Sequence, residues 1–258
     1  MARYFVCFGV ALFSTIVGSL SGLGGGVIIK PSLDALASSY LSLGEIGALS
    51  SITVFSMAVL STVKGVRGGI QLDMRVFLPL AVSSAIGGSL GNYSFQLIEG
   101  AMGEDLCGIL QSVMLLALMA CVLTLYLMDK KCRPLHIRNK GVIFISGLIL
   151  GGLAAFLGIG GGPVNVAALK LLFGLEEREQ VFGSLFIILF AQGSKLISLA
   201  ITGSAFSTIA LPVLMIIGGM LGGSIGSSMA IRFPVRYIRK VFIYAVVLVM
   251  LITMTAFI

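Results

Sequence analysis

Charged residues are scarce in this chain of 258 residues, where they make up 10% of the sequence, against roughly a quarter in soluble domains. Hydrophobic residues make up 58%, and the mean hydropathy is +1.12. This composition cannot cover a water-exposed surface, so it excludes an ordinary soluble fold. The net charge of +7 could suggest nucleic acid, but the basic residues lie mostly between apolar runs, as in cytoplasmic loops of membrane proteins. We therefore expect no nucleic-acid binding.

The chain also lacks the residues of most catalytic and metal sites. It has one histidine, His136, in a polar segment, and it has no HExxH motif and no Ser/His/Asp set. The cysteines have no metal-type spacing, and we interpret them as small apolar residues. They are Cys7, Cys107, Cys121 and Cys132. We expect no enzymatic activity, no metal and no cofactor.

Long apolar runs take up most of the chain instead. A bilayer core of roughly 30 Å needs about 20 apolar residues per helix, and a helix satisfies its own backbone hydrogen bonds. The runs are too continuous for a transmembrane β-barrel. We predict an all-α integral membrane protein with eight hydrophobic segments. These are residues 5–29, 46–63, 76–93, 106–128, 142–173, 181–201, 208–231 and 241–258.

Two glycine motifs occur twice in the chain. GLGGG at 22–26 returns as GIGGG at 158–162, displaced by 136 residues, and GGSLG at 87–91 returns as GGSIG at 222–226, displaced by 135. Internal duplication is common in secondary transporters. It also argues against a secretory signal at the N-terminus, because an internal copy of the same segment cannot be one. We divide the chain into a first transmembrane repeat (1–128), a basic cytoplasmic hinge loop (129–140) and a second transmembrane repeat (141–258).

The loop charges indicate that the two halves are inverted repeats. Loops 64–75 and 232–240 and the hinge are basic, whereas loop 93–105 has acidic residues and no Lys or Arg. Eight simple crossings would place basic loops on opposite faces, against the positive-inside rule. The conflict disappears if the glycine-rich segment of each half is broken or re-entrant and returns to its own face. Each half then makes three crossings, and both termini lie outside.

The triple glycines are the leading candidates for a binding site. Each glycine costs a helix about 1 kcal/mol relative to alanine, and broken backbone at membrane depth is tolerated where it lines a cavity. Pro163 suits the first turn of a new helix, whose N-terminus can bind an anion. We predict an anion site between the two runs, and we favour close helix packing for the motifs at 87–91 and 222–226. The six residues of the runs are Gly24, Gly25, Gly26, Gly160, Gly161 and Gly162.

Polar residues within the apolar segments are further candidates. Lys195 lies centrally in segment 181–201 and could neutralise a bound oxyanion, the alternative being that it snorkels to a face. Lys30 follows the first glycine run, and we expect it to face a loop near Asp34. Hydroxyls in membrane helices often bond their own backbone, which is the alternative for the serines and threonines. The neutral residues that could complete an oxyanion shell are Ser50, Ser51, Thr53, Asn165 and Gln192.

GLGGG followed by a proline in the first half, and GIGGGPVN in the second, resemble the TauE/SafE sulfite exporter family of permeases over nearly the whole chain. The resemblance implies a secondary transporter in a bacterial or archaeal cytoplasmic membrane. It implies transport of a small sulfur-containing anion, such as sulfite or an organosulfonate, by alternating access, coupled to a proton or sodium ion. An anion channel with a glycine-lined pore is the alternative function. The expected partners are therefore a small anion, the coupling ion and the lipid bilayer, and a homodimer is one open oligomeric state. One departure is that Ala167 stands where the first half has Pro31, so the two half-sites are not strictly equivalent.

Overall fold

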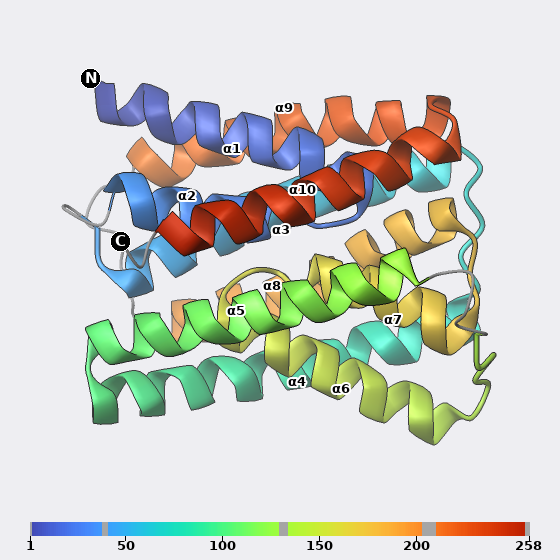
Figure 1. The fold of residues 1–258 in the computed structure, drawn as a ribbon, viewed down its shortest axis with the longest axis horizontal. Helices are drawn as coiled ribbons and strands as arrows, with labels where there is room; N and C mark the ends of the chain where they lie inside the picture. Colours follow the sequence, from blue (N-terminus) through green and yellow to red (C-terminus); the bar gives the residue numbers. More distant parts are fainter. Residues whose placement is uncertain (1, 38–40, 129–133, 203–209, 256–258) are drawn as a thin grey trace.

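The computed structural model describes residues 2–37, 41–128, 134–202 and 210–255. In these ranges the chain forms ten α-helices and no strand (Figure 1). Eight of the helices are long and apolar enough to cross a membrane, which confirms the predicted multi-pass all-α fold. The helices are α1 (Ala2–Ser21), α2 (Gly26–Ala37), α3 (Leu43–Arg67), α4 (Met74–Met102), α5 (Glu104–Leu127), α6 (Lys140–Leu157), α7 (Gly162–Phe173), α8 (Glu177–Thr202), α9 (Ala210–Arg232) and α10 (Val235–Thr255).

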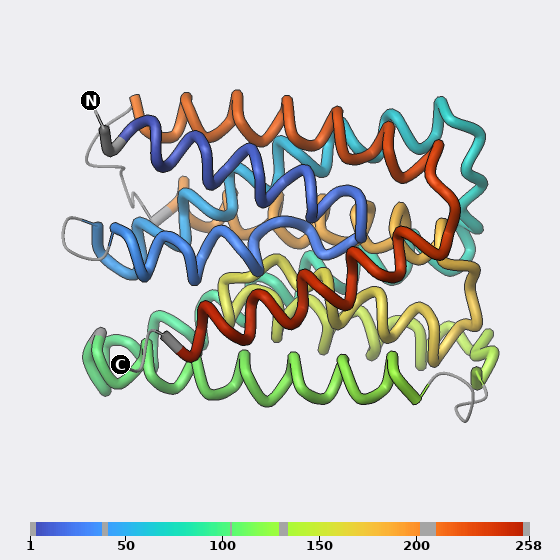
Figure 2. Tube along the Cα trace, turned by 45° about the horizontal axis from the view of Figure 1, so that its top comes forward, coloured from blue at the N-terminus to red at the C-terminus, as the bar shows by residue number. Residues whose placement is uncertain are grey.

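Each glycine-rich segment is broken into a long helix and a short one, as predicted. The breaks contain glycines with positive φ, a conformation that costs other residues about 1–2 kcal/mol. The chain reverses at each break, so that α2 returns beside α1 (Figure 2) and α7 runs back towards the end of the bundle where α6 begins (Figure 1). The positive-φ glycines are Gly22, Gly24 and Gly25 in the first break and Gly158, Gly160 and Gly161 in the second.

The bundle has two ends, which we name by what lies there. The first helix, α1, begins and the last, α10, ends at the left in Figures 1 and 2, and we call this end the termini face. Loops 68–73, 134–139 and 233–234 lie at the opposite end, the hinge face. In each half the helix pair at the break is followed by three helices that run alternately between the two faces (Figure 1). This is the arrangement that the charge pattern suggested for each half, while the inverted relation of the halves stays a prediction.

Polar caps fix where several helices begin. The Ser42 hydroxyl accepts a hydrogen bond from the Glu45 backbone N–H, and the Glu45 carboxylate accepts one from the Ser42 N–H, which completes a capping box at the start of α3. The Asp73 carboxylate accepts from the Arg75 N–H at 3.0 Å at the start of α4. Asn139 does the same for α6, through the Gly141 N–H at 2.9 Å. These caps lie at the two ends of the bundle, where water is available to the remaining N–H groups.

The connections differ in part from those predicted. The predicted loop 93–105 is wrong, because α4 continues to Met102 and Gly103 alone separates it from α5. Polar residues such as Glu99 can extend a helix beyond the apolar core of a bilayer, so a drop in hydropathy does not mark its end. Residues 129–133 of the hinge, loop residues 203–207 and the outer ends of the segments predicted at 208–231 and 241–258 lie outside the described ranges.

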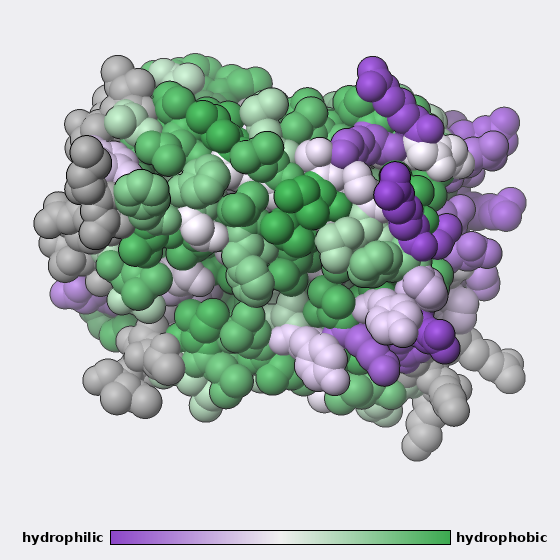
Figure 3. Space-filling model, turned by 90° about the horizontal axis from the view of Figure 1, so that it is seen from above, coloured by the Kyte–Doolittle hydropathy of each residue, from purple (hydrophilic) through white to green (hydrophobic). Residues whose placement is uncertain are grey.

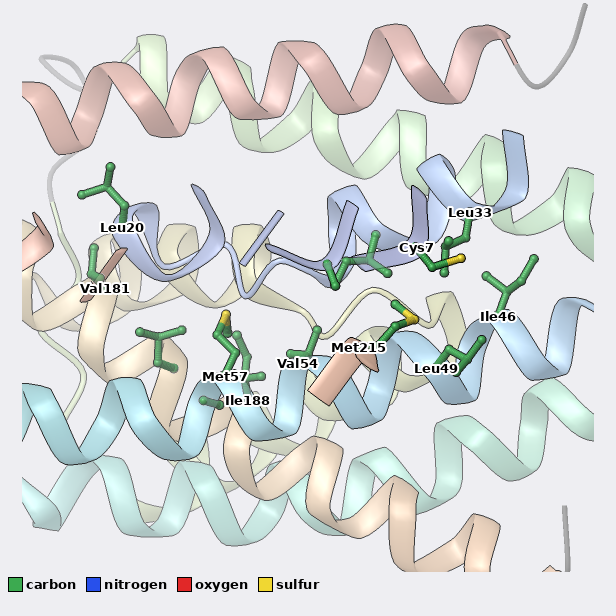
Figure 4. Close-up of a cluster of buried hydrophobic side chains, with 14 of the residues drawn as sticks. Cys7, Leu20, Leu33, Ile46, Leu49, Val54, Met57, Val181, Ile188 and Met215 are labelled. Carbon is green, nitrogen blue, oxygen red and sulfur yellow. The ribbon is translucent and has the colours of Figure 1, made fainter. Parts of the chain in front are cut away.

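The second glycine motif of each half lets helices pack closely, as predicted. Gly87 and Gly91 lie against the α6 backbone, and Gly222 and Gly226 lie against α1. A Cβ atom at Gly223 would lie 2.8 Å from Met57 Cγ of α3, closer than packed side chains allow. These contacts are small-residue packing of the type that membrane helices use. A buried apolar cluster, drawn in Figure 4, fills the space between α1, α2, α3, α8 and α9.

The surface is apolar along the length of the bundle. In Figure 3 hydrophobic side chains cover most of the visible face, and hydrophilic side chains gather at the hinge face. Phe5 is 73% exposed, Tyr244 is 71% exposed and Ile201 is 80% exposed. Such a continuous apolar surface would be costly in water and is suited to contact with lipid.

Candidate anion-binding site

The two helix breaks interlock at the centre of the bundle. A Cβ atom at Gly26 would lie 2.7 Å from the Ile159 carbonyl oxygen, and one at Gly162 would collide with the Leu23 main chain. Ile159 is the repeat counterpart of Leu23, and Gly162 is that of Gly26, because each pair is separated by 136 residues. The contact of Gly26 with Ile159 and the contact of Gly162 with Leu23 are therefore equivalent contacts in the two halves. Main-chain atoms therefore fill the space between the two glycine runs. The cavity nearest to the breaks that we describe is lined by Gly158 and by none of the six glycines of the runs, and a site between the runs stays a prediction.

A small cavity lies beside the interlocked breaks, towards the termini face. Its volume is about 120 Å³, and Gly158, at the end of α6, forms part of its wall. The share of one water molecule in the liquid is about 30 Å³, so the cavity has room for a small anion. Its polar lining comes from α2, α4, α5 and α8 and consists of Lys30, Asn92, Gln96, Glu99, Gln111 and Lys195.

Lys195 on α8 places a buried ammonium group in the wall of this cavity. The side chain is 5% exposed, so it does not reach a surface, and its Nζ lies 3.7 Å from the Cβ position of Gly47 on α3. Among the described residues the ammonium group has no hydrogen-bond or ion-pair partner. A buried cation without a partner is costly, and an anion in the cavity would supply the missing charge and acceptors.

Lys30 on α2 lines the same cavity, and the expectation that it faces a loop is wrong. It is 5% exposed and donates hydrogen bonds to the Leu157 carbonyl oxygen, at 3.1 Å, and to the Gln111 side-chain oxygen. Because α2 turns back from the break into the protein, a residue one turn beyond the glycines lies deep in the bundle. Leu157 ends α6, where free carbonyl groups carry partial negative charge, so Lys30 caps that helix.

Two of the three hydroxyl candidates, Ser51 and Thr53, bond their own helix. The Ser51 hydroxyl donates to the Gly47 carbonyl oxygen at 2.7 Å, and the Thr53 hydroxyl donates to the Leu49 carbonyl oxygen at 2.7 Å. Both groups are buried. Their geometry corresponds to the self-bonding alternative, in which the hydroxyl stabilises the local helix and does not point at a ligand.

The amide candidates flank the second break. The side-chain oxygens of Asn165 and Gln192 are buried and have no hydrogen-bond partner among the described atoms. Asn165 Oδ1 lies 3.6 Å from the Cβ position of Gly161, and Gln192 Nε2 lies 3.5 Å from that of Gly160. Pro163 occupies the first turn of α7, as predicted. Asn165 and Gln192 lie beside the break and do not line the cavity, whereas Gly158 and Lys195 do.

Several lining residues were missed by the sequence reasoning, although the sequence contains a signal for them. Asn92, Gln96 and Glu99 are spaced four and three residues apart near the end of α4, which places them on one face of a helix. Gln111 is a polar residue within an otherwise apolar run. An ionisable or strongly polar group at membrane depth is by default a candidate functional residue.

The fold and the site define a polytopic helical membrane protein with interlocked helix breaks and, beside them, a small polar cavity lined by two lysines and one glutamate. The model of the family described as Sulfite exporter TauE/SafE matches residues 7–253, so the chain belongs to that family. It is also similar to the "Probable membrane transporter protein YunE" of Bacillus subtilis (strain 168), with 26% identity over 260 residues that cover 91% of this chain and 92% of the relative. The family resemblance is thereby confirmed, and the chain is an integral, multi-pass membrane transporter.

Proposed function

We propose that the chain is a secondary transporter that carries a small sulfur-containing anion, such as sulfite or an organosulfonate, by alternating access. The observation that carries this proposal is Lys195, a buried ammonium group that lines a cavity and has no partner among the described residues. An oxyanion accepts hydrogen bonds from such a group and neutralises its charge. The family name supports the sulfur chemistry of the anion.

The packing on the two sides of the breaks supports alternating access. The cavity lies towards the termini face, where α3 begins and α4 ends. On the hinge side Phe182 packs against Gly65, and Val181 and Val166 pack against Gly22. These three side chains are at most 2% exposed. An anion in the cavity would reach the hinge face after this apolar packing separates, which is the change that alternating access requires.

The exchanged contacts at the breaks support an inverted repeat. Gly24 packs against Ile188 of α8, and Gly160 packs against Val54 of α3, so each break contacts the long helix that follows the other break. Together with the Gly26 and Gly162 contacts, this pattern suits two halves related by a two-fold axis in the membrane plane. In transporters of that design the substrate binds near the axis at mid-membrane depth.

The test is anion counterflow in proteoliposomes with sulfite, sulfoacetate, taurine and thiosulfate, with and without proton and sodium gradients. We expect saturable counterflow for at least one anion and a loss of about tenfold or more in Lys195→Gln, which keeps a polar side chain but removes the charge. Arg75→Gln is the matched control, because Arg75 is an exposed cation at the start of α4. Equal rates in Lys195→Gln and the unchanged chain would refute the role of Lys195. Conductance without counterflow would identify the channel alternative.

A further inference from the structure

A groove between α3 and α9 at the hinge face is a second polar feature, separate from the anion cavity. Its volume is about 370 Å³, and its walls come from the end of α3 and the last turns of α9. The residues that matter to its chemistry are Lys64, Ser224, Ser228 and Arg232, with Ile225 and Phe233 as apolar neighbours.

The ammonium group of Lys64 is held in place in this groove. It donates to the Ser224 carbonyl oxygen at 2.8 Å, to the Ser224 hydroxyl at 2.7 Å and to the Ser228 hydroxyl at 2.9 Å. The Ser228 hydroxyl donates a hydrogen bond to the Ser224 carbonyl oxygen, at 2.8 Å. The Ser224 hydroxyl therefore acts as an acceptor for Lys64 and has its hydrogen available for a further acceptor. Arg232, the exposed last residue of α9, adds a guanidinium group that can bind two phosphate oxygens.

Apolar side chains continue from this polar end towards the middle of the bundle. Leu221 and Ile225 on α9 are 49% and 46% exposed and lie one turn apart, and Val63 on α3 is 43% exposed. A ligand that fits this surface has an anionic head at the hinge face and apolar chains along the helices. Free phosphate would use the head position and leave the apolar surface uncovered.

The repeat provides an internal comparison, because the corresponding groove between α8 and α4 has no charged side chain among the described residues that line it. The residue displaced by 135 from Ser224 is Ser89, and its hydroxyl meets the Ser194 hydroxyl at 2.6 Å, where Ser224 meets a lysine. The counterpart of Arg232 is Leu97, which is 56% exposed. The cations thus occur in the α3–α9 groove and are replaced by hydroxyl and apolar groups in its counterpart at the termini face. The cytoplasmic leaflet of a membrane carries the negative surface potential, and the basic loops assign the hinge face to that side.

We propose that the α3–α9 groove binds the phosphate-bearing headgroup of an anionic phospholipid in the leaflet at the hinge face. The Ser224 hydroxyl and Arg232 contact the phosphate, Lys64 supplies fixed positive charge beneath it, and the acyl chains lie along Leu221 and Ile225. A lipid bound across α3 and α9 links these two helices at the end of the bundle where the basic loops gather. This inference is independent of the identity of the transported anion.

The test uses the full chain purified in detergent, with lipid retention measured by native mass spectrometry and unfolding followed by circular dichroism. We expect phosphatidylglycerol to remain bound and to raise Tm by a few degrees, while phosphatidylcholine does neither. Arg232→Gln changes an exposed residue and should remove most of this shift without lowering the basal Tm, and Lys64→Gln should do the same with a lower basal Tm. Arg75→Gln, a cation exposed on the same face outside the groove, should keep the shift.

Three results would overturn the proposal. The first is an equal shift with phosphatidylcholine, which would indicate general solvation by lipid. The second is a full phosphatidylglycerol shift in Arg232→Gln. The third is an equal shift with inorganic phosphate or glycerol 3-phosphate, which would identify a free-anion site in place of a lipid site. None of these results affects the counterflow assay, so a failure here is distinguishable from a failure of the transport proposal.

Discussion

Lys30 on α2 donates a hydrogen bond to the Leu157 carbonyl oxygen at the end of α6, at 3.1 Å, and so joins the short helix of one half to the break of the other. Lys195 lines the same cavity and has no such partner among the described residues. We therefore propose different roles for the two lysines. Lys30 stabilises the fold around the cavity, and Lys195 binds the anion.

This difference predicts opposite effects on stability. Lys30→Gln should lower the free energy of unfolding by about 1–3 kcal/mol, because it leaves buried acceptors at Leu157 and Gln111 without a donor. Lys195→Gln should not lower it, because it removes a buried charge that has no partner among the described residues. Thermal unfolding of both variants without anion is the measurement. A larger loss in Lys195→Gln than in Lys30→Gln would contradict the assignment of roles.

The interlocked breaks predict a steep position dependence for glycine substitution. Gly162→Ala places a Cβ atom on the Leu23 main chain and should prevent folding into a stable protein. Gly9→Ala on α1 is the control, because no atom lies within 4 Å of its Cβ position, and alanine there should be neutral or stabilising by up to about 1 kcal/mol. Yield of monodisperse protein and Tm would compare the two variants. Similar values for both would show that the interlock is not required.

The hinge-side packing predicts coupling between two positions that are far apart in the sequence. A Cβ atom at Gly65 would collide with the ring of Phe182, which is 1% exposed and has little room to move. Gly65→Ala and Phe182→Ala should each lower Tm, the first by overpacking and the second by leaving a cavity. The double variant should lose less than the sum of the two single losses, because the new methyl group enters the vacated space. If the Tm loss of the double variant equalled the sum of the two single losses, the two residues would not be packed against each other as described.

The inverted arrangement predicts opposite labelling of the two faces. Single cysteines would replace Gly100, on the last turns of α4 near the termini face, and Arg236, on the first turn of α10 at the hinge face. Both positions are exposed, and Cys121 and Cys132 would be replaced by serine in the background. An impermeant maleimide should label Gly100→Cys from outside intact cells and Arg236→Cys only after permeabilisation. Labelling of both from one side would exclude the inverted repeat.

Much of the architecture follows from the sequence, because hydropathy and glycine act locally. A run of about 20 apolar residues has few alternatives to a membrane helix, and three neighbouring glycines mark a break with little ambiguity. The depth of Lys30 was not predictable in the same way. It depends on the direction in which α2 leaves the break, and that direction is set by packing against Leu23, Ile159 and α3.

The cavity is harder still to predict, because its polar lining is assembled from four helices. Lys195 could be identified alone as an ionisable residue in an apolar run. Of the neighbours of Lys195 in the cavity, Gln96 lies beyond residue 93, where the predicted segment ends, Asn92 lies just inside that end, and Gln111 comes from the next helix. Residues that come together only when the helices pack have no common spacing in the sequence, so the sequence does not predict that they line one cavity.

The interlock of Gly26 with Ile159 and of Gly162 with Leu23 also bears on electrical insulation. A carrier must keep protons and other ions from leaking while its substrate passes, and a row of water molecules along the centre of the bundle would conduct protons. Here main chain packs against main chain, and the side chains of Val54 and Ile188 close against glycines of the same breaks. We therefore propose that the substrate passes beside the breaks, and that the close packing at the breaks limits leakage.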